Sequence, residues 1–224
     1  TEATEPPPVD TNPLTGEALD AVNDSRPFAI MINNLVKAVP QCGISKADMI
    51  YEIVAEGSVT RFMAIFHDLS DVDVIGPVRS VRPYFYRVAQ HYGAILTSAG
   101  GSDEADSLIK NEGYNRRDGI AGAGAAFYRD QWRKENKGFE HSLMTTGEKL
   151  MKSAEKHGFK TTMEGLSYKF DKEFWNYAKL ISGVLRYGMP IDQVIKMISS
   201  LQMDSETINS WKVGVERALK KYIQ

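Results

Sequence analysis

The sequence predicts an α/β domain, with a mixed sheet and flanking helices, followed by a small all-α C-terminal module. Strand-like apolar runs alternate with helical segments up to about residue 158, a pattern that is typical of α/β domains. From residue 160 onward only helical patterns occur. The 224 residues are 42% hydrophobic and 10% aromatic, as in ordinary folded proteins, so we expect one large domain or two small ones.

The first elements are a polar tether and three strands. Residues 1–13 contain four prolines and few apolar side chains, a composition that favours extended chain and predicts a tether. RPFAIMINN, at residues 26–34, is a short apolar run typical of a buried strand. DMIYEIVAEG and VTRFMAIFHD, at residues 48–57 and 59–68, are rich in β-branched and aromatic residues, with a Gly-Ser pair between them. These two runs predict a β-hairpin.

The next segments alternate between helix and strand. Tyr84, Val88 and Tyr92 recur at helical spacing, which predicts a helix that ends at Gly93. AILTSAGG is then a strand that runs into a glycine turn. Ser102 is suited to N-cap the helix SDEADSLIKNEG, because its hydroxyl oxygen can accept a backbone hydrogen bond. The acidic residues in the first turn are a second signal of a helix start.

The remainder of the α/β domain is less regular. Residues 116–138 are rich in Gly, Ala and charged side chains, and they predict a long loop with one short helix near residues 128–135. EHSLMTT, at residues 140–146, then predicts a strand. TGEKLMKSAEKHG predicts a helix that is capped by Thr146.

The helical module is expected over residues 160–224, after an α/β domain at residues 14–159. It carries ten Lys and Arg against seven Asp and Glu, a local excess of positive charge. Three amphipathic helices are predicted in it, at residues 173–188, 190–201 and 205–223.

Charge and cysteine content exclude several classes of function. A formal net charge of −2 gives no global basic field, so no nucleic-acid partner is expected and any recognition of anions must be local. No run approaches the roughly 18 apolar residues that span a bilayer, and the first residues lack a signal-peptide pattern, which predicts a soluble chain. Cys42 is the only cysteine, so an intrachain disulfide and a multi-cysteine metal site are excluded, and a turn or core role is favoured over a nucleophile.

The main candidate binding site is GPVRSVRP, at residues 76–83. Its first Gly-Pro pair breaks the preceding strand and its last proline suits the first turn of a helix, so Arg79, Ser80 and Arg82 are expected on a strand-to-helix turn. Guanidinium groups and free backbone N–H groups at such a turn match phosphate or carboxylate. Alternatively, each arginine pairs with a local carboxylate and only fixes the loop. The local carboxylates are those of Asp68, Asp71 and Asp73.

Two further groups are expected to help bind the anion. Arg61 lies on the predicted hairpin and supplies another guanidinium group. The turn of Gly100, Gly101 and Ser102 precedes a helix and offers backbone N–H groups, without the spacing or the Lys of a P-loop. No cofactor is expected at this site.

Acidic residues and a histidine form a second candidate site. Glu52 and Glu56 fall with Asp48 on one face of the predicted strand, because their spacing is even. We interpret them in three ways: as ligands of a hard cation, as partners of Arg61, or as the solvated face of an edge strand. We assign no metal site. His141, between Glu140 and Ser142, has the ingredients of an acid–base group.

Several unusual strings, in order, resemble the YerB-like family of bacterial proteins, whose role is not established. They are NPLTGEAL, RPFAIMINN, PQCGISKADMIYE, EGSVTRFMAIFHD, IGPVRSVRPYF, AGGS and EHSLMTT, over about residues 12–158. Members of the family are typically lipoproteins on the outer face of the cytoplasmic membrane. The resemblance therefore implies an extracytoplasmic location and a membrane anchor through a lipidated cysteine that this chain does not contain. The family normally continues into a β-rich second domain.

Residues 160–224 resemble a helical segment near the C-terminus of adenosylcobalamin-dependent ribonucleotide reductases. The resemblance extends from KTTMEGLSYKF to GVERALKKYI. Such enzymes require radical-relay cysteines and a cobalamin-binding barrel, so reductase activity is not implied and the segment is interpreted as a structural passenger. The chain is thus an apparent chimera, whether a natural fusion, a designed fusion or a mis-joined gene.

These observations predict an extracytoplasmic module that binds an anionic ligand of the bacterial envelope at Arg79 and Arg82. A rival prediction is a hydrolase or transferase that acts on envelope polymers through Glu52 or Glu56 and His141. An inactive reductase fragment is another alternative. A protein-interaction module that binds an envelope protein through exposed aromatic side chains is the last. Those aromatic residues are Tyr84, Phe85 and Tyr86.

Overall fold

The computed structural model describes residues 11–19, 23–57, 59–163 and 190–200. The chain divides into two compact units, Thr1–Tyr168 and Lys169–Gln224, and each is described by itself. Among the helices of the described stretches, none combines the length and the apolar character that crossing a bilayer requires.

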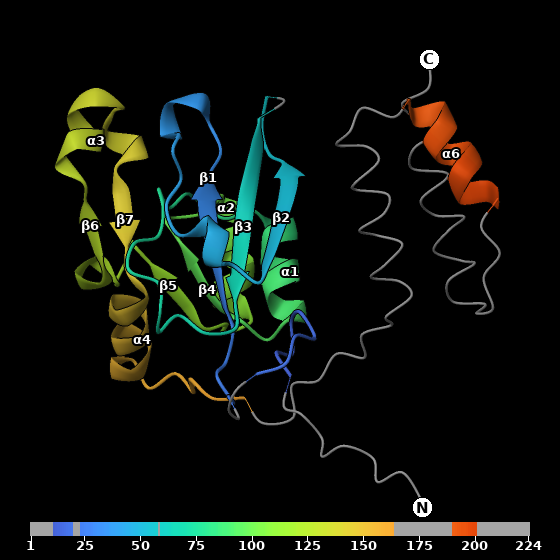
Figure 1. The fold of residues 1–224 in the computed structure, drawn as a ribbon. Coiled ribbons are helices and arrows are strands. Elements are labelled where there is room, and N and C mark those ends of the chain that lie inside the picture. The colour runs from blue at the N-terminus through green and yellow to red at the C-terminus, as the bar shows by residue number, and fades with distance from the viewer. Residues whose placement is uncertain (1–10, 20–22, 58, 164–189, 201–224) are drawn as a thin grey trace, which may run out of the picture. The chain divides into compact units, whose positions relative to one another are not determined.

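The first unit is built on a five-stranded sheet with the order β2-β3-β1-β4-β5 (Figure 1). Its strands are β1 (Phe28–Asn33), β2 (Met49–Val54), β3 (Thr60–Phe66), β4 (Ile95–Ser98) and β5 (Arg116–Asp118). β1 lies in the middle, antiparallel to β3 and parallel to β4. The predicted α/β class with a mixed sheet and flanking helices is therefore confirmed.

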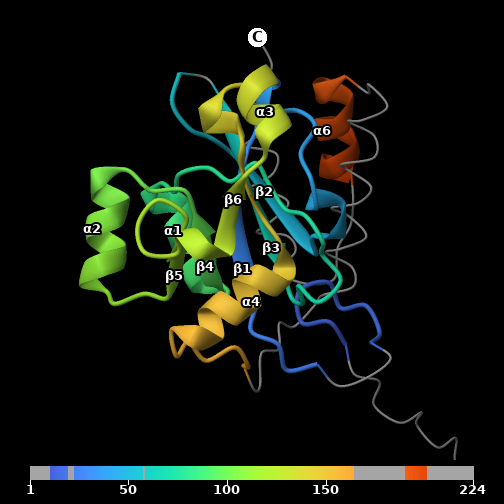
Figure 2. The same cartoon turned by 90° about the vertical axis from the view of Figure 1, so that its left-hand side faces the viewer.

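Every residue of β1 is buried, because helices cover both faces of the sheet. Phe28 and Ile30 face one core cluster, and Ala29 and Met31 face the other. A strand buried on both sides needs no polar alternation, which explains the continuous apolar run in the sequence. α1 (Pro83–His91) and α2 (Asp103–Asn111) pack on the Met31 face, and α4 (Gly147–Lys156) packs on the opposite face (Figure 2).

β2 and β3 form the predicted hairpin. The register pairs Ile50 with Ala64 and Val54 with Thr60. β2 is an edge strand in which half-buried and exposed residues alternate, so Ile50 and Val54 face solvent. β2 therefore has one face in the core and one face in water, whereas β3 is largely buried on both faces.

Residues 116–138 contain more regular structure than the predicted loop. β5 pairs in parallel with β4, and β6 (Phe127–Arg129) pairs with β7 (Leu143–Thr145) in a small second sheet. α3 (Gln131–Asn136) begins later than expected. Strands of three residues carry too little periodicity to be recognised, so their neighbours decide their conformation. Short 3₁₀ helices lie at η1 (Val36–Ala38), η2 (Ile44–Lys46), η3 (Gly124–Ala126) and η4 (Phe139–His141).

Both predicted N-caps are confirmed. Ser102 Oγ accepts a hydrogen bond from Ala105 N–H at 3.3 Å, and Thr146 Oγ1 accepts one from Lys149 N–H at 3.1 Å. The strand predicted from residue 140 begins later, at Leu143, because the residues before it form η4.

The buried face of α1 differs from the predicted one. Phe85 and Tyr86 are fully buried, whereas Tyr84 is 39% exposed. Since residues 84, 85 and 86 are all aromatic, helical spacing alone does not determine which of them faces the sheet. The expected patch of three exposed aromatic side chains does not form, so the interaction module predicted from it loses its basis.

Residues 24–26 and 161–163, which flank the sheet in the sequence, lie side by side. Arg26 N donates to Thr161 O at 2.8 Å, and Met163 N donates to Asp24 O at 2.7 Å, around an antiparallel bridge. The segment that follows α4 is thus fixed to the segment that precedes β1. We call this arrangement the end clasp.

The second unit is described over residues 190–200. There α6 (Ile191–Ser200) follows Pro190, as predicted, and Val194 and Ile198 are buried. The helices predicted at residues 173–188 and 205–223 lie outside the described residues, as do the first ten residues of the predicted tether.

Gly147, the first residue of α4, is expected to tolerate no side chain. A Cβ atom there would lie 2.0 Å from the backbone carbonyl oxygen of Leu69. Alanine favours a helix by roughly 1 kcal/mol over glycine, but overpacking costs about 1–3 kcal/mol. We therefore expect Gly147→Ala to lower the free energy of unfolding, measured by urea unfolding with circular dichroism. Gly124→Ala is the control, since nothing lies within 4 Å of its Cβ position, and an equal loss in both variants would contradict this explanation.

Candidate functional site

The segment Ile75–Arg82, which carries the candidate arginines, crosses the end of the sheet. Arg79 N donates to Met31 O of β1 at 3.0 Å, and Ala99 N, just after β4, donates to Arg79 O at 2.9 Å. Further backbone bonds join the segment to β7 and to the loop of Cys42. Backbone hydrogen bonds therefore hold this turn, whatever the arginine side chains do.

Arg61 and Arg82 converge on one carboxylate and one hydroxyl group. Arg61 Nη2, from β3, donates to Glu56 Oε2 at 3.1 Å, and Arg82 Nε donates to Glu56 Oε1. Ser80 Oγ accepts from Arg61 at 3.2 Å and from Arg82 at 3.1 Å. The Ser80 carbonyl oxygen also accepts from Arg61, at 2.7 Å. The structure thus brings together three predicted binding residues, Arg61, Ser80 and Arg82.

The opposite charges of this cluster differ in burial. The side chains of Arg61 and Arg82 are 10% and 18% exposed, whereas that of Glu56 is 60% exposed. The hydrogen bond from Arg82 lowers the pKa of Glu56. Burial, and then the charge of Arg82, lower the pKa of Arg61. The guanidinium groups are therefore held within the fold, while the carboxylate that neutralises them lies outward.

Arg79 belongs to a neighbouring group with Glu140 and His141. Arg79 Nη2 donates to Glu140 Oε2 at 2.7 Å, and Glu140 Oε1 lies 3.4 Å from His141 Nε2. His141 Nδ1 lies 2.9 Å from the amide nitrogen of Asn33, which makes Nδ1 the acceptor because that nitrogen only donates. Burial lowers the pKa of His141, so its imidazole is neutral at pH 7.

The acidic residues predicted on one strand face do not converge on a common point. Glu56 pairs with Arg61, which is one of the three interpretations that the sequence left open. Glu52 Oε1 accepts from Thr60 Oγ1 at 2.6 Å, and Asp48 accepts from the backbone just after β3 at 2.6 Å. Within the part of the chain that the structure describes, no group of three or more His, Cys, Asp or Glu side chains is placed to hold a metal ion.

Two of the three carboxylates near the arginine segment in the sequence have other partners. Asp68 accepts from Asn23 at 2.9 Å, and Asp71 pairs with Lys46 at 2.8 Å. Arg79 instead binds Glu140, which lies 61 residues away in the sequence, where no pattern links the two. The pairing of Glu56 with Arg61 can be predicted from the sequence, since Glu56 flanks the hairpin turn that also positions Arg61.

The turn of Gly100, Gly101 and Ser102 lies beside the arginine segment. Gly100 N donates to Asp118 Oδ1 at 2.8 Å, and Ser102 N donates to Val81 O at 3.2 Å. These two N–H groups, which the sequence suggested as anion donors, are thus engaged within the protein. Val81 N donates back to Gly100 O at 3.1 Å, so the turn supports the arginine segment.

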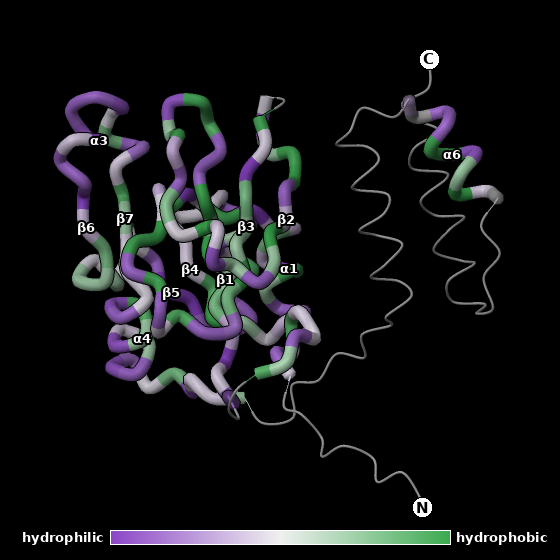
Figure 3. Tube along the Cα trace, viewed as in Figure 1, coloured by the Kyte–Doolittle hydropathy of each residue, from purple (hydrophilic) through white to green (hydrophobic). Residues whose placement is uncertain are grey.

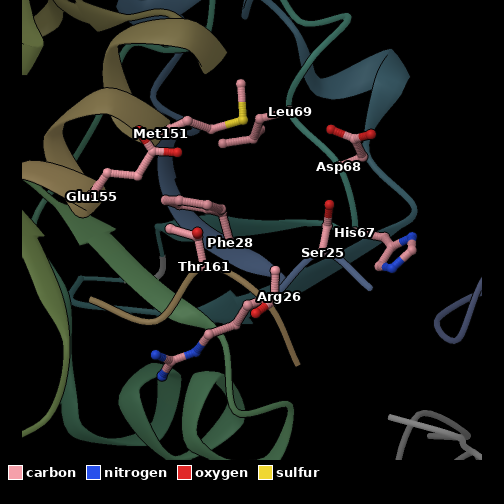
Figure 4. A pocket seen from close by; sticks show the side chains of 10 residues that line it. Ser25, Arg26, Phe28, His67, Asp68, Leu69, Met151, Glu155 and Thr161 are labelled. Atoms are coloured by element: carbon pink, nitrogen blue, oxygen red, sulfur yellow. The ribbon is translucent and has the colours of Figure 1, made fainter. Parts of the chain in front are cut away.

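A separate pocket of about 170 Å³ lies between the start of β1 and α4 (Figure 4). Phe28, Leu69 and Met151 give it an apolar side, and Arg26 and Glu155 add polar groups. The described residues that line it include none of the predicted site residues. The arginine cluster at the end of the sheet therefore remains the candidate site.

The fold and the site define a mixed α/β domain that carries arginine and carboxylate groups at one end of its sheet. The chain belongs to the family described as "Protein of unknown function (DUF3048) N-terminal domain", which matches residues 14–160. A second family, "NrdJ homologue C-terminal domain", matches residues 140–224. Both resemblances inferred from the sequence are confirmed.

A curated relative and a solved structure agree with this assignment. "Putative lipoprotein YerB" of Bacillus subtilis (strain 168) is 35% identical over 153 residues, which are 68% of this chain and 45% of that protein. The crystal structure of YerB from Bacillus subtilis matches with a TM-score of 0.62 and 35% identity, over 69% of this chain and 52% of that chain. The chain spans about half the length of the relatives that it matches.

His141 is expected to make stability depend on pH. Its folded-state pKa is below its ordinary value of 6.5, because burial disfavours the charged ring. As the pH falls below 6.5, the unfolded chain binds this proton first, so the free energy of unfolding decreases until the folded pKa is passed. We expect His141→Gln to remove this part of the pH dependence in urea unfolding between about pH 5 and 7.5. An unaltered pH slope in His141→Gln would refute the assignment.

Proposed function

We propose that this domain binds an anionic ligand of the bacterial cell envelope, outside the cytoplasmic membrane, through Arg61, Arg79 and Arg82. The description of the relative as a lipoprotein supports this location. The turn from Gly100 to Ser102 enters the proposal as the support of the arginine segment. No cofactor and no nucleic acid take part.

The unequal burial of opposite charges carries the proposal. The side chains of Arg61, Arg79 and Arg82 are 10%, 24% and 18% exposed, whereas those of Glu56 and Glu140 are 60% and 58% exposed. A buried guanidinium group requires an anionic partner, whereas Glu56 and Glu140 are largely exposed and regain hydration when they leave the arginines. An incoming anion is therefore able to replace Glu56 or Glu140 on the guanidinium groups.

The arrangement suits a phosphate group better than a single carboxylate. A phosphate monoester has three terminal oxygen atoms and about two negative charges near neutral pH, so it can accept hydrogen bonds from more than one guanidinium group at once. Ser80 Oγ accepts from both Arg61 and Arg82, which leaves its own hydrogen free to donate to the ligand. The proposed ligand class is a phosphorylated glycan or a phosphate-bearing lipid head group.

Binding is favoured over hydrolase or transferase chemistry. His141 is 3% exposed, and its ring nitrogens face Asn33 and Glu140, so it does not reach a substrate at the surface. Glu52 is bonded to Thr60 rather than to the arginine cluster. The alternative of an inactive reductase fragment is inferred from residues 160–224, and the match of the second family, residues 140–224, contains none of Arg61, Arg79 and Arg82.

The proposal predicts opposite effects of arginine and glutamate substitutions. NMR titration of the full chain with glycerol 3-phosphate and with glucose 6-phosphate should shift the amide signals of residues 79–82. Arg79→Ala with Arg82→Ala should weaken binding by about tenfold or more, since charged hydrogen bonds contribute about 1.5–3 kcal/mol. Glu56→Gln should strengthen it, because the competing carboxylate is removed. A preference between the two probes distinguishes a lipid head group from a glycan.

Arg87→Ala is the matched control for these substitutions. Arg87 lies on α1, is 50% exposed and pairs with Glu112 at 3.0 Å, so its loss also breaks an arginine–glutamate pair. It should leave the titration unchanged. A folded Arg79→Ala, Arg82→Ala variant that binds both probes as tightly as the parent would overturn the proposal.

A further inference from the structure

Large apolar side chains are exposed at the end of the first unit where β1 finishes. Val36, Trp132 and Phe139 are 88%, 58% and 60% exposed, and they lie on η1, α3 and η4. We call these three residues the apolar tips. Figures 1 and 2 show α3 and the turn after β1 projecting beyond the same end of the sheet, and Figure 3 shows hydrophobic residues at the top of that turn.

The turns that carry the apolar tips are fixed to one another. Arg133, which is 5% exposed, donates from Nη1 to Ala38 O at 2.9 Å and from Nη2 to Pro40 O, so α3 is bonded to the turn of Val36. Arg129 Nη1 donates to Phe139 O at 2.7 Å, which ties η4 to the end of β6. The apolar tips therefore stand on a preorganised surface, and little ordering is needed when they are buried.

Each apolar tip has a cationic neighbour. Lys37 follows Val36 directly in the sequence. Lys137 Nζ lies 5.8 Å from the ring centre of Trp132, and the guanidinium carbon of Arg129 lies 3.8 Å from the ring centre of Phe139. The surface thus combines apolar side chains with positive charges at its edge.

The acidic residues of the same turns are already bonded within the protein. Asp130 caps α3, Glu135 accepts from Gln131, and Glu140 pairs with Arg79. The same segments, residues 36–38 and 129–141, contain five Lys and Arg against three Asp and Glu, so the charge beside the apolar tips is positive on balance. Two copies of this surface would place like charges together, so self-association is disfavoured and a negatively charged partner fits.

We propose that the apolar tips dock this domain on an anionic lipid bilayer. Aromatic and aliphatic side chains favour the boundary between head groups and acyl chains, and neighbouring Lys and Arg are attracted to anionic lipids. The apolar tips project from η1, α3 and η4 at one end of the sheet, which suits insertion into a deformable layer. The proposal uses none of the three arginines of the candidate site and does not rest on the proposed function.

The test uses the full chain and co-sedimentation with vesicles. Vesicles of phosphatidylglycerol and phosphatidylcholine in equal amounts are compared with vesicles of phosphatidylcholine alone. We expect binding at low salt to the anionic vesicles only, and its loss near about 0.5 M salt, where surface charges are screened. The variant Val36→Ser, Trp132→Gln, Phe139→Ser should bind at least about tenfold more weakly.

The control removes exposed apolar side chains elsewhere on the unit. Ile50 and Val74 are 46% and 37% exposed, and Ile50→Thr with Val74→Thr should bind vesicles like the parent. Urea unfolding verifies that each variant is folded, and the triple variant should still bind glycerol 3-phosphate, which separates this surface from the arginine site. If the parent chain does not co-sediment with anionic vesicles, the proposal is overturned. So does a triple variant that binds them as tightly as the parent, because the contact then lies elsewhere on the chain.

Tryptophan fluorescence reports on one tip directly. The sequence contains three tryptophans, at positions 132, 175 and 211, so Trp175→Phe with Trp211→Phe leaves Trp132 as the reporter. Its emission should move to shorter wavelength when anionic vesicles are added, since the indole enters a less polar layer. Unchanged emission on binding of this variant overturns the proposal.

Discussion

The backbone of Ile75–Val81 joins the separate parts of the α/β unit, and the arrangement of the site depends on it. Buried N–H and C=O groups must be bonded, and those of this segment reach β1, β7, the loop of Cys42 and the turn after β4. Gly76 is required there, because its φ is +139° and a Cβ atom would lie 2.9 Å from Met144 Sδ. The backbone of Arg79 is therefore fixed, and its long side chain reaches the carboxylate of Glu140 on η4.

Polar chemistry gathers where the central strand ends. Asn33, the last residue of β1, is 1% exposed and lies opposite Arg61 in the register with β3. Its side chain reaches His141 at 2.9 Å and accepts from Leu35 N–H at 3.0 Å. A buried amide must have such partners, so the apolar strand passes at its last residue into a bonded polar network. The arginine side chains and the His141 ring are consequently held within the fold. The carboxylates of Glu56 and Glu140 are largely exposed.

The sequence predicts those features whose causes are local. β1, the hairpin and the N-cap at Ser102 follow from apolar runs, alternation and capping chemistry, which short stretches encode. β5 cannot be recognised from its sequence, RRD, because it becomes a strand through its pairing with β4 and not through the preferences of its own side chains. The pairing of Arg79 with Glu140 joins residues 61 apart, and only the assembled fold brings them together. For α1, packing against the sheet decides that Phe85 and Tyr86 are buried and that Tyr84 is 39% exposed.

The end clasp places the segment that follows α4 beside the segment that precedes β1. Bonds from Arg26 to Thr161 and from Met163 to Asp24 close the unit on itself. Domains in which two distant chain segments meet at the surface in this way tolerate being joined to other domains. One family matches residues 14–160 and another matches residues 140–224, so the two matches overlap across β7 and α4. All strand pairings of the described residues lie within residues 28–145, so an exchange of the chain beyond Met163 would break none of them.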